Sequence, residues 1–432
     1  MTIFPELVFG TAHECGPSRA GKDLSALRHR AGHDPRCAAL HALFAVLFCG
    51  RDSQAALDAV LGDATGADAL QSLLVPSDRA LCTELLYGSL RHFLLLDAFA
   101  ANYLHKAAKL PLEMRLAMVQ SLYEAAFTRS AHHAVVNWTV TLVRNRFGKV
   151  LGNVANGALR AMFRDLPHLA RPGAGQDGNA PEELALRFGM PLWITAMWAG
   201  LYPEQELLAL LAASQQRPVS GIRLNAARED WQAVREDLGR AIKAGGAAAL
   251  PAPSEYSLAF EGKAPPGLRQ FLAHGRASRQ SPAVSALLRQ LEPASWPQPL
   301  WDCCAGRGGK TLALLEQGIP VAIASDVSQK RLGGLPEEYQ RLQLSSPPCP
   351  EIRLMAADAA GADAAAQAAD ASYPVRAPAA DSFGTILLDA PCSGLGTLAR
   401  RPEIRFRRGS EDITQLAALQ AGLLDAVWPC LR

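Results

Sequence analysis

Residues Pro299–Gly318, with the sequence PLWDCCAGRGGKTLALLEQG, decide the fold class of the C-terminal part of the chain. They contain a short apolar run, a glycine-rich turn and an apolar segment at helical spacing. Further strand-like runs follow at VAIASD (321–326), IRLMAAD (352–358) and GTILLDAP (384–391). Alternating strands and helices predict a doubly wound parallel sheet, a Rossmann-like α/β fold that binds ligands beyond the carboxyl ends of its strands. We assign this domain to residues 281–432.

Upstream of this domain the pattern changes several times. Residues 36–166 show apolar positions at helical spacing with almost no strand pattern, which predicts an all-α domain. The stretch RPGAGQDGNAP at 171–181 is typical of a linker, and residues 181–280 mix a helical start with short strands, which predicts a small α+β connecting region. We expect residues 1–35 to form a flexible arm and the alanine-rich residues 356–381 to form a surface insertion.

The composition restricts the class of protein. Of the 432 residues, 49% are hydrophobic and 19% charged, which excludes a fully disordered chain. The longest apolar stretch, Cys37–Cys49, is too short to span a bilayer. Nine cysteines without a CxxC pair indicate reduced thiols and no zinc site, and a net charge of +2 does not by itself indicate nucleic acid. We expect a cytoplasmic monomer with no metal and no membrane association.

The glycine turn Asp302–Thr311 has the form of a cofactor loop. Its glycines allow backbone N–H groups to approach a ligand at a helix start. A phosphate-binding P-loop needs glycine at position 304, which is Cys304, and the dinucleotide pattern GxGxxG fails at Thr311. Asp326 and Asp358, each ending a strand run, supply carboxylates for ribose hydroxyls and an adenine amino group. Singly, each aspartate is more often a helix cap, but together they predict adenosylmethionine binding.

The fourth strand run ends in Asp389-Ala390-Pro391-Cys392 on a loop shaped by proline and glycine. A thiol at the ligand edge of a sheet has little packing purpose, whereas isolated cysteines are usually buried in a core. This position favours a functional role for Cys392.

Two of these motifs, DCCAGRGGKT (302–311) and DAPCSG (389–394), resemble the first and fourth motifs of the RNA cytosine-5 methyltransferases, most closely the bacterial 16S rRNA enzymes. DRALCTELLYGSLR (78–91) and NVANGALR (153–160) resemble the NusB-type RNA-binding domain that these proteins carry. HGRASRQSPAVSALL (274–288) resembles the family's approach to its catalytic domain. The resemblance implies a NusB-like helical domain, the small α+β domain and a class I methyltransferase domain, with 16S rRNA as the partner.

Carried over by position, the resemblance implies which residues form the site. The cofactor S-adenosyl-L-methionine would be lined by Cys304, Ala305, Gly306, Arg307, Gly308, Gly309 and Lys310, with Asp326 at the ribose, Asp358 near the adenine and Asp389 beside the cofactor. Asp389 would also contact the target base, and Cys392 would assist product release. The chain departs from the family at 305–307, where Ala-Ala-Pro is common, and at Ser281, where the family has aspartate.

The chemistry requires a second thiol. Carbon 5 of cytosine is a poor nucleophile, so a thiolate first adds at carbon 6 and the resulting enamine attacks the methyl group. In the family that thiol belongs to a Thr-Cys-Ser motif, which is not among these residues, and Cys430 follows a helix rather than a strand. We therefore expect a truncated, inactive chain with an incomplete methyltransferase domain. A non-catalytic RNA-binding protein and a methyltransferase acting on tRNA or protein are the alternatives.

An arginine-rich segment follows the fourth motif. Such runs often form only a solvated face, but next to the proposed site they favour phosphate and base contacts with RNA. The predicted RNA-binding residues are Arg400, Arg401, Arg405, Arg407 and Arg408.

Overall fold

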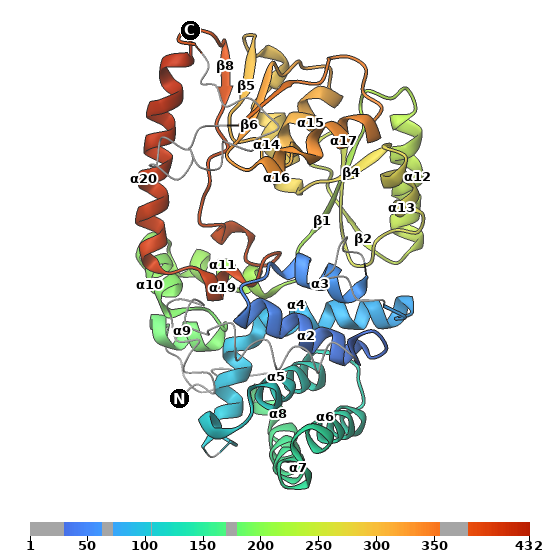
Figure 1. Cartoon of the computed structure of the whole chain (residues 1–432), viewed down its shortest axis with the longest axis vertical. Coiled ribbons are helices and arrows are strands. Elements are labelled where there is room, and N and C mark those ends of the chain that lie inside the picture. The colour runs from blue at the N-terminus through green and yellow to red at the C-terminus, as the bar shows by residue number, and fades with distance from the viewer. Residues whose placement is uncertain (1–29, 63–71, 105, 170–178, 355–378) are drawn as a thin grey trace. The chain divides into compact units, whose positions relative to one another are not determined.

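The computed structural model describes residues 30–62, 72–104, 106–169, 179–354 and 379–432 (Figure 1). It divides into two compact units. The first contains Met1–Gln216 and Gly394–Asp412, and the second contains Arg217–Ser393 and Ile413–Arg432. The dividing point at Gln216 lies inside the connecting region predicted over 181–280. Most of the predicted arm and most of the alanine-rich insertion lie outside the described residues.

The first unit begins as a bundle of helices, as the apolar spacing predicts. The helices are α2 (Pro35–Phe48), α3 (Ser53–Leu61), α4 (Pro76–Ala101), α5 (Leu112–Phe127), α6 (His132–Phe147), α7 (Lys149–Arg164) and α8 (Leu166–Leu169). Asp34 caps the start of α2, because its side chain accepts hydrogen bonds from the N–H groups of Arg36 and Cys37. Helices α2 and α5 are buried nearly all round and form the centre of the bundle.

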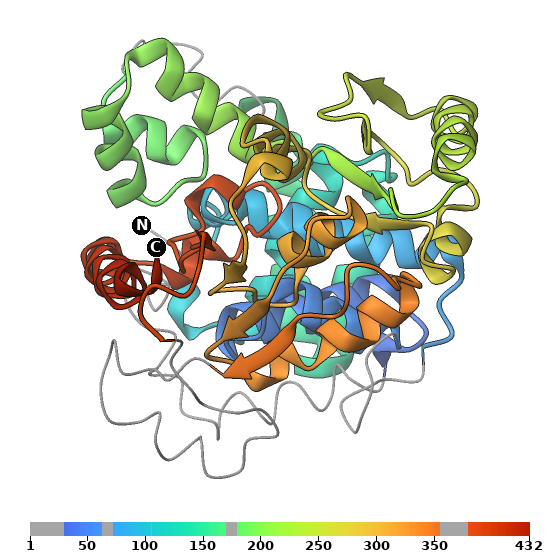
Figure 2. The same ribbon diagram turned by 90° about the horizontal axis from the view of Figure 1, so that it is seen from above.

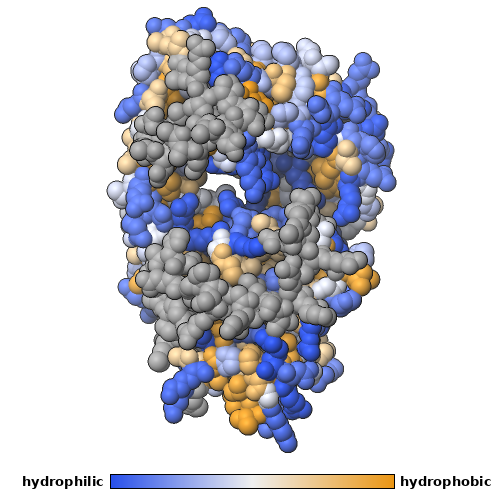
Figure 3. Space-filling view, in the orientation of Figure 1, coloured by the Kyte–Doolittle hydropathy of each residue, from blue (hydrophilic) through white to orange (hydrophobic). Residues whose placement is uncertain are grey.

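Two buried glutamates of α5 are paired with arginines. Glu124 of α5 is 1% exposed and accepts two hydrogen bonds from Arg36, at 2.8 and 2.6 Å. Glu113 at the other end of α5 pairs with Arg146 at 3.0 Å. Such pairing avoids the cost of an unpaired buried charge. Val150 and Val154 of α7 are exposed. Apolar surface gathers over α6 and α7 in Figure 3.

Three further helices of the first unit enclose a separate core. They are α9 (Pro181–Arg187), α10 (Leu192–Leu201) and α11 (Glu204–Gln215). Leu398 and Ile404 pack into this core from the returning segment 394–412, which contains the short helix α19 (Ile404–Arg407). The arginine-rich segment is therefore part of the first unit.

The second unit starts with a small antiparallel sheet in the order β2-β3-β1-β4. Its elements are β1 (Ser220–Leu224), α12 (Trp231–Ala244), β2 (Ala248–Leu250), β3 (Ser257–Glu261), α13 (Leu268–Ala273) and β4 (Ala277–Arg279). Both ribbon views show α12 beside this sheet (Figure 2), and Val234, Leu238 and Ile242 of α12 pack on Ile222 and Phe260. The predicted α+β element is present.

The remainder of the second unit is a parallel sheet in the order β7-β6-β5-β8. Its elements are α14 (Pro282–Gln290), β5 (Leu300–Asp302), α15 (Gly309–Glu316), β6 (Ile323–Asp326), α16 (Gln329–Leu332), α17 (Gly334–Arg341), β7 (Glu351–Leu354), β8 (Thr385–Leu387) and α20 (Ser410–Val427). Neighbouring residues of β5 belong to different cores, Leu300 with α15 and Trp301 with Val427 of α20, because strand side chains alternate between faces. The sheet is thus covered on both faces, and the predicted fold class is confirmed.

None of the helices in the described ranges is both long and apolar enough to cross a membrane.

Candidate functional site

The loop after β5 leaves open space beside its backbone. Gly306 and Gly308 have φ angles of +59° and +79°, a region that favours glycine. A Cβ atom at Gly308 would lie 2.9 Å from the Leu335 side chain, which would have to shift to make room. A Cβ atom at Gly306 or Gly309 would meet nothing within 4 Å. This loop therefore has room for a ligand on the side where α15 begins.

Asp326, at the carboxyl end of β6, holds this loop in place. It is 4% exposed, and its Oδ2 accepts a hydrogen bond of 3.0 Å from the backbone N–H of Gly306. Its Oδ1 accepts from the N–H of Ser328 at 2.8 Å and pairs with Arg331 at 3.3 Å. A carboxylate offers about four acceptor positions, so these contacts leave about one for a ligand hydroxyl. Asp326 already binds the loop, and its predicted contact with ribose stays a prediction.

Lys310 and Asp389 join the two sequence motifs. Lys310 lies in the first turn of α15, and its ammonium group forms an ion pair and hydrogen bond with Asp389, just beyond β8. The Asp389 side chain is 53% exposed, so it also faces solvent. Cys392 follows on the same loop and is exposed. The carbonyl of Pro391 accepts a hydrogen bond of 2.8 Å from Gln420 of α20, which positions this loop.

Asp302 is a site residue that the sequence analysis missed. It ends β5, is 1% exposed, and accepts a hydrogen bond of 2.6 Å from Thr311 through Oδ2. Its Oδ1 has no hydrogen-bond partner among the described residues. Burial raises the pKa of Asp302 to about 6, although Thr311 and Lys310 oppose the rise. The sequence feature that could have identified Asp302 is its position at the end of a strand, as the first residue of the glycine motif.

The predicted cysteine and alanine positions of the loop are held by neighbouring strands. Cys303 is buried, and its thiol donates to the carbonyl of Leu387 in β8 at 3.2 Å. Cys304 is half-buried, and the N–H of Ala305 donates to the backbone carbonyl of Ser325 in β6 at 2.9 Å. Arg307 is exposed at the tip of the turn.

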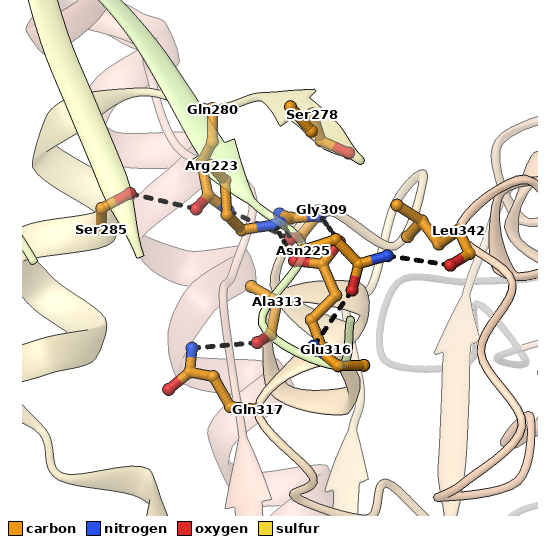
Figure 4. Close-up of polar contacts among 12 residues, drawn as sticks. Arg223, Asn225, Ser278, Gln280, Ser285, Gly309, Ala313, Glu316, Gln317 and Leu342 are labelled. Carbon is orange, nitrogen blue, oxygen red and sulfur yellow. Dashed lines mark hydrogen bonds and ion pairs between the residues drawn. The ribbon is translucent and has the colours of Figure 1, made fainter. Parts of the chain in front are cut away.

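A buried polar network connects the small sheet to the start of α15 (Figure 4). Arg223 of β1 pairs with Glu316 of α15 through contacts of 2.6 and 3.1 Å, and the two side chains are 7% and 2% exposed. Arg223 and Gln280 also donate to the carbonyl of Gly309, at 2.9 and 3.1 Å. Burial raises the pKa of Glu316, and the Arg223 guanidinium opposes that rise. Through Gly309 and Glu316 this network fixes both ends of α15, including the end that borders the glycine loop.

Arg405 does not fit its predicted role as an RNA contact. It is 2% exposed, and its guanidinium donates to the carbonyls of Leu398 at 3.0 Å and Ser214 at 2.9 Å. Burial lowers its pKa to about 9, which still leaves it charged at neutral pH. The prediction for Arg405 is wrong, because the arginine-rich segment packs into the helical unit. There the Arg405 guanidinium donates its hydrogen bonds to backbone carbonyls.

The other predicted arginines lie nearer the surface. Arg401 is exposed and pairs with Asp52 at 2.9 Å. Arg408 pairs with Asp412 at 3.3 Å, and Arg407 donates to the carbonyl of Arg51. Arg400 is exposed. These four stay predicted RNA contacts, although Arg401 and Arg407 also hold the segment against the helices of its own unit.

Asp358, predicted near the adenine, lies outside the described residues. Within the described ranges, no cluster of three or more His, Cys, Asp or Glu side chains could hold a metal ion.

Comparisons with known proteins agree with both halves of the chain. The family described as 16S rRNA methyltransferase RsmB/F matches residues 289–432, and the NusB family matches residues 33–164. The ribosomal RNA small subunit methyltransferase B of Vibrio cholerae is 31% identical over 405 residues, covering 92% of this chain and 83% of the relative. The enzyme of the same name from Pseudomonas putida is 32% identical over 407 residues, with the same coverage. The crystal structure of PH0851 has a TM-score of 0.63 at 19% identity, covering 92% of this chain and 83% of that one, which shows a shared fold.

Proposed function

Because the chain belongs to the family of 16S rRNA methyltransferases B, we propose that it transfers a methyl group from S-adenosyl-L-methionine to carbon 5 of a cytosine in 16S rRNA. The observation that carries this proposal is the contact between Lys310 and Asp389. It brings together the loop proposed for the cofactor and the loop proposed for the base through two residues that are 79 positions apart in the sequence.

The loop after β5 fits adenosylmethionine in two respects. The open space beside Gly306 and Gly309 accommodates a ligand close to the backbone. The unpartnered Oδ1 of Asp302 is a buried acceptor, and the methionine part of the cofactor carries an ammonium donor. Cys304 through Lys310 would line the cofactor, and Asp326 would hold the ribose with its remaining acceptor position. The cofactor supplies the electrophilic methyl group.

The residues beyond β8 would act on the base. Asp389, half exposed and fixed by Lys310, would hold the ring nitrogen 3 side of the cytosine. Delivery of a proton to ring nitrogen 3 from this Lys310–Asp389 pair would favour the addition of a thiolate at carbon 6, because it neutralises the negative charge that the thiolate brings into the ring. Cys392, exposed on the same loop, would assist loss of the carbon-5 proton and release of the methylated product.

The attacking thiol is not assigned to a residue of this chain, since no Thr-Cys-Ser motif occurs in the 432 residues. If this polypeptide transfers labelled methyl groups to unmodified 16S rRNA, Cys392 becomes the candidate for the attacking thiol.

The test of the proposed function is bisulfite sequencing of RNA from cells with and without the gene. We expect one cytosine of 16S rRNA to lose its 5-methyl group when the gene is deleted, and to regain it on complementation. Loss of a 5-methylcytidine from tRNA instead would support a tRNA methyltransferase. An unchanged methylation pattern in all RNA would support the non-catalytic RNA-binding alternative and contradict the proposal.

A further inference from the structure

A cavity of about 470 Å³ opens on the small antiparallel sheet of the second unit. Its volume lies in the range of ligand-binding pockets, and it shares no lining residue with the loops after β5 and β8. It is lined by Arg228, Gln270, Phe271, His274, Arg276 and Gln343. We call these six residues the α13 pocket, because Gln270 and Phe271 belong to helix α13.

The α13 pocket has an excess of positive charge that is held in a defined geometry. Arg228 and Arg276 both contact Asp230, through Oδ1 at 3.4 Å and Oδ2 at 3.1 Å. One carboxylate is thus shared between two guanidinium groups, which leaves one unit of positive charge. The Arg276 side chain is still 43% exposed, so its remaining N–H donors face solvent. A guanidinium oriented in this way is suited to bind an anionic oxygen such as that of phosphate.

Buried hydrogen bonds make the walls of the α13 pocket rigid. Asn225, 1% exposed at the end of β1, donates to the carbonyls of Gly275 and Leu342, each at 2.8 Å. Figure 4 shows its amide directed at Leu342. Gly275 lies between two pocket residues, and Leu342 precedes another. One buried side chain therefore ties together the two loops that carry half of the pocket.

The backbone at this pocket adopts conformations that cost energy. Gln343 has a φ of +54°, and its side-chain carbonyl accepts a hydrogen bond of 2.7 Å from Arg228. Gly275 has a φ of +66°, and a Cβ atom there would lie 1.9 Å from the carbonyl of Arg341. Strained backbone persists where the surroundings enforce it, and it gathers at binding sites. The strained backbone at Gln343 places its side-chain amide beside Arg228.

We propose that the α13 pocket binds one nucleotide of a single-stranded segment of RNA. The half-buried ring of Phe271 would stack on the base, Arg276 and Arg228 would contact the phosphate, and Gln343 would offer its amide to a base edge. Aromatic rings beside cationic groups are the usual means by which proteins hold single strands without strict sequence preference. The proposal rests on the proposed function in one respect, since that function makes RNA the polyanion that this chain meets. The pocket would hold RNA at a second point, apart from the base that is modified.

The test is binding of a fluorescein-labelled RNA octamer of mixed sequence to the 432-residue chain, measured by fluorescence anisotropy at several salt concentrations. We expect Arg276→Gln to weaken binding about tenfold and to reduce the salt slope by about 0.7, the value for one lost phosphate contact on a single strand. Phe271→Leu keeps an apolar side chain in the core and should weaken binding about tenfold with an unchanged slope, because stacking carries no counterion release. The matched control is Arg240→Gln, an exposed arginine of α12 that pairs only locally with Asp237.

The location of the RNA is tested by irradiating an octamer that contains 4-thiouridine and sequencing the cross-linked peptide. A cross-link within residues 268–276 supports the proposal. Wild-type affinity in both pocket variants, or cross-links confined to other segments, would overturn it. Circular dichroism melts and adenosylmethionine titrations of the same variants exclude unfolding as the cause of a loss. Gene deletion tests the proposed function separately. If deletion abolishes a 5-methylcytidine in 16S rRNA while the pocket variants bind RNA normally, the proposed function stands and only the proposal for the α13 pocket is overturned.

Discussion

The glycine loop at 304–310 and the arginine segment at 400–408 were both predicted to contact ligands, but their surroundings in the structure differ. The glycine loop lies at the carboxyl ends of parallel strands and leaves open space beside Gly306 and Gly309. The arginine segment is part of the helical unit, and Arg405 at its centre is buried against backbone carbonyls. A motif placed by sheet topology keeps its position in space, whereas a run of like charges acquires its role from whatever packs against it.

The largest effect that would sharpen this comparison is expected from Arg405→Gln. The substitution removes a buried cation and leaves the carbonyls of Ser214 and Leu398 without their donor, which should lower the free energy of unfolding by about 3–5 kcal/mol. For a unit of this size, that corresponds to a fall in Tm of roughly 10 °C in differential scanning calorimetry. Arg408→Gln is the control, since its pair with Asp412 is partly exposed. Equal stability of both variants would contradict the buried role of Arg405.

The second prediction concerns Asp302, which directly precedes the glycine loop, and here the substitution should raise the free energy of unfolding. Burial raises the pKa of Asp302 from 3.8 to about 6, so the folded state binds the proton more tightly than the unfolded state does. Stability therefore falls as pH rises from about 4 to about 6, and above this window ionised Asp302 costs about 3 kcal/mol. Asp302→Asn should keep the Thr311 hydrogen bond and raise the free energy of unfolding by about 2–3 kcal/mol at pH 7.5, with no gain below about pH 4.

The same Asp302→Asn variant should bind adenosylmethionine more weakly, since a neutral amide replaces the acceptor proposed for the ammonium group. Thermal melts across this pH range and calorimetric titrations measure the two effects, with Asp237→Asn on exposed α12 as the control. If Asp302→Asn is no more stable than the wild type at neutral pH, the buried Asp302 carboxylate does not destabilise the fold.

The smallest stability effect is expected from Arg401→Gln, the exposed partner of Asp52. Surface pairs contribute at most about 1 kcal/mol, so Tm should change by only a few degrees. If Arg401 contacts RNA as predicted, the salt slope of binding to a 16S rRNA fragment should fall by about 0.7–0.9. An unchanged slope would assign Arg401 wholly to the helical unit and make the contrast with the glycine loop complete.

How much the sequence predicted depends on the distance over which each feature is determined. The parallel sheet, its motif loops and the helical unit follow from local periodicity and turn residues, and the structure confirms the fold class. The pair of Arg223 and Glu316 and the contact of Arg401 with Asp52 join residues 93 and 349 positions apart. No local pattern identifies such partners, because the charge of a side chain does not reveal what will bury it. Asp302 was missed for a different reason: its burial and its unpartnered oxygen exist only in the folded sheet.

The most direct test of the central claim, that the glycine loop binds adenosylmethionine, is isothermal titration calorimetry of the 432-residue chain. We expect saturable binding with one site, weakened about tenfold to a hundredfold by Asp326→Ala, since the ribose contact and the support of Gly306 are lost together. Asp237→Ala on exposed α12 should bind as the wild type does. Absence of binding by the wild-type chain, or equal affinity in the Asp326→Ala variant, would contradict the assignment of the site to this loop.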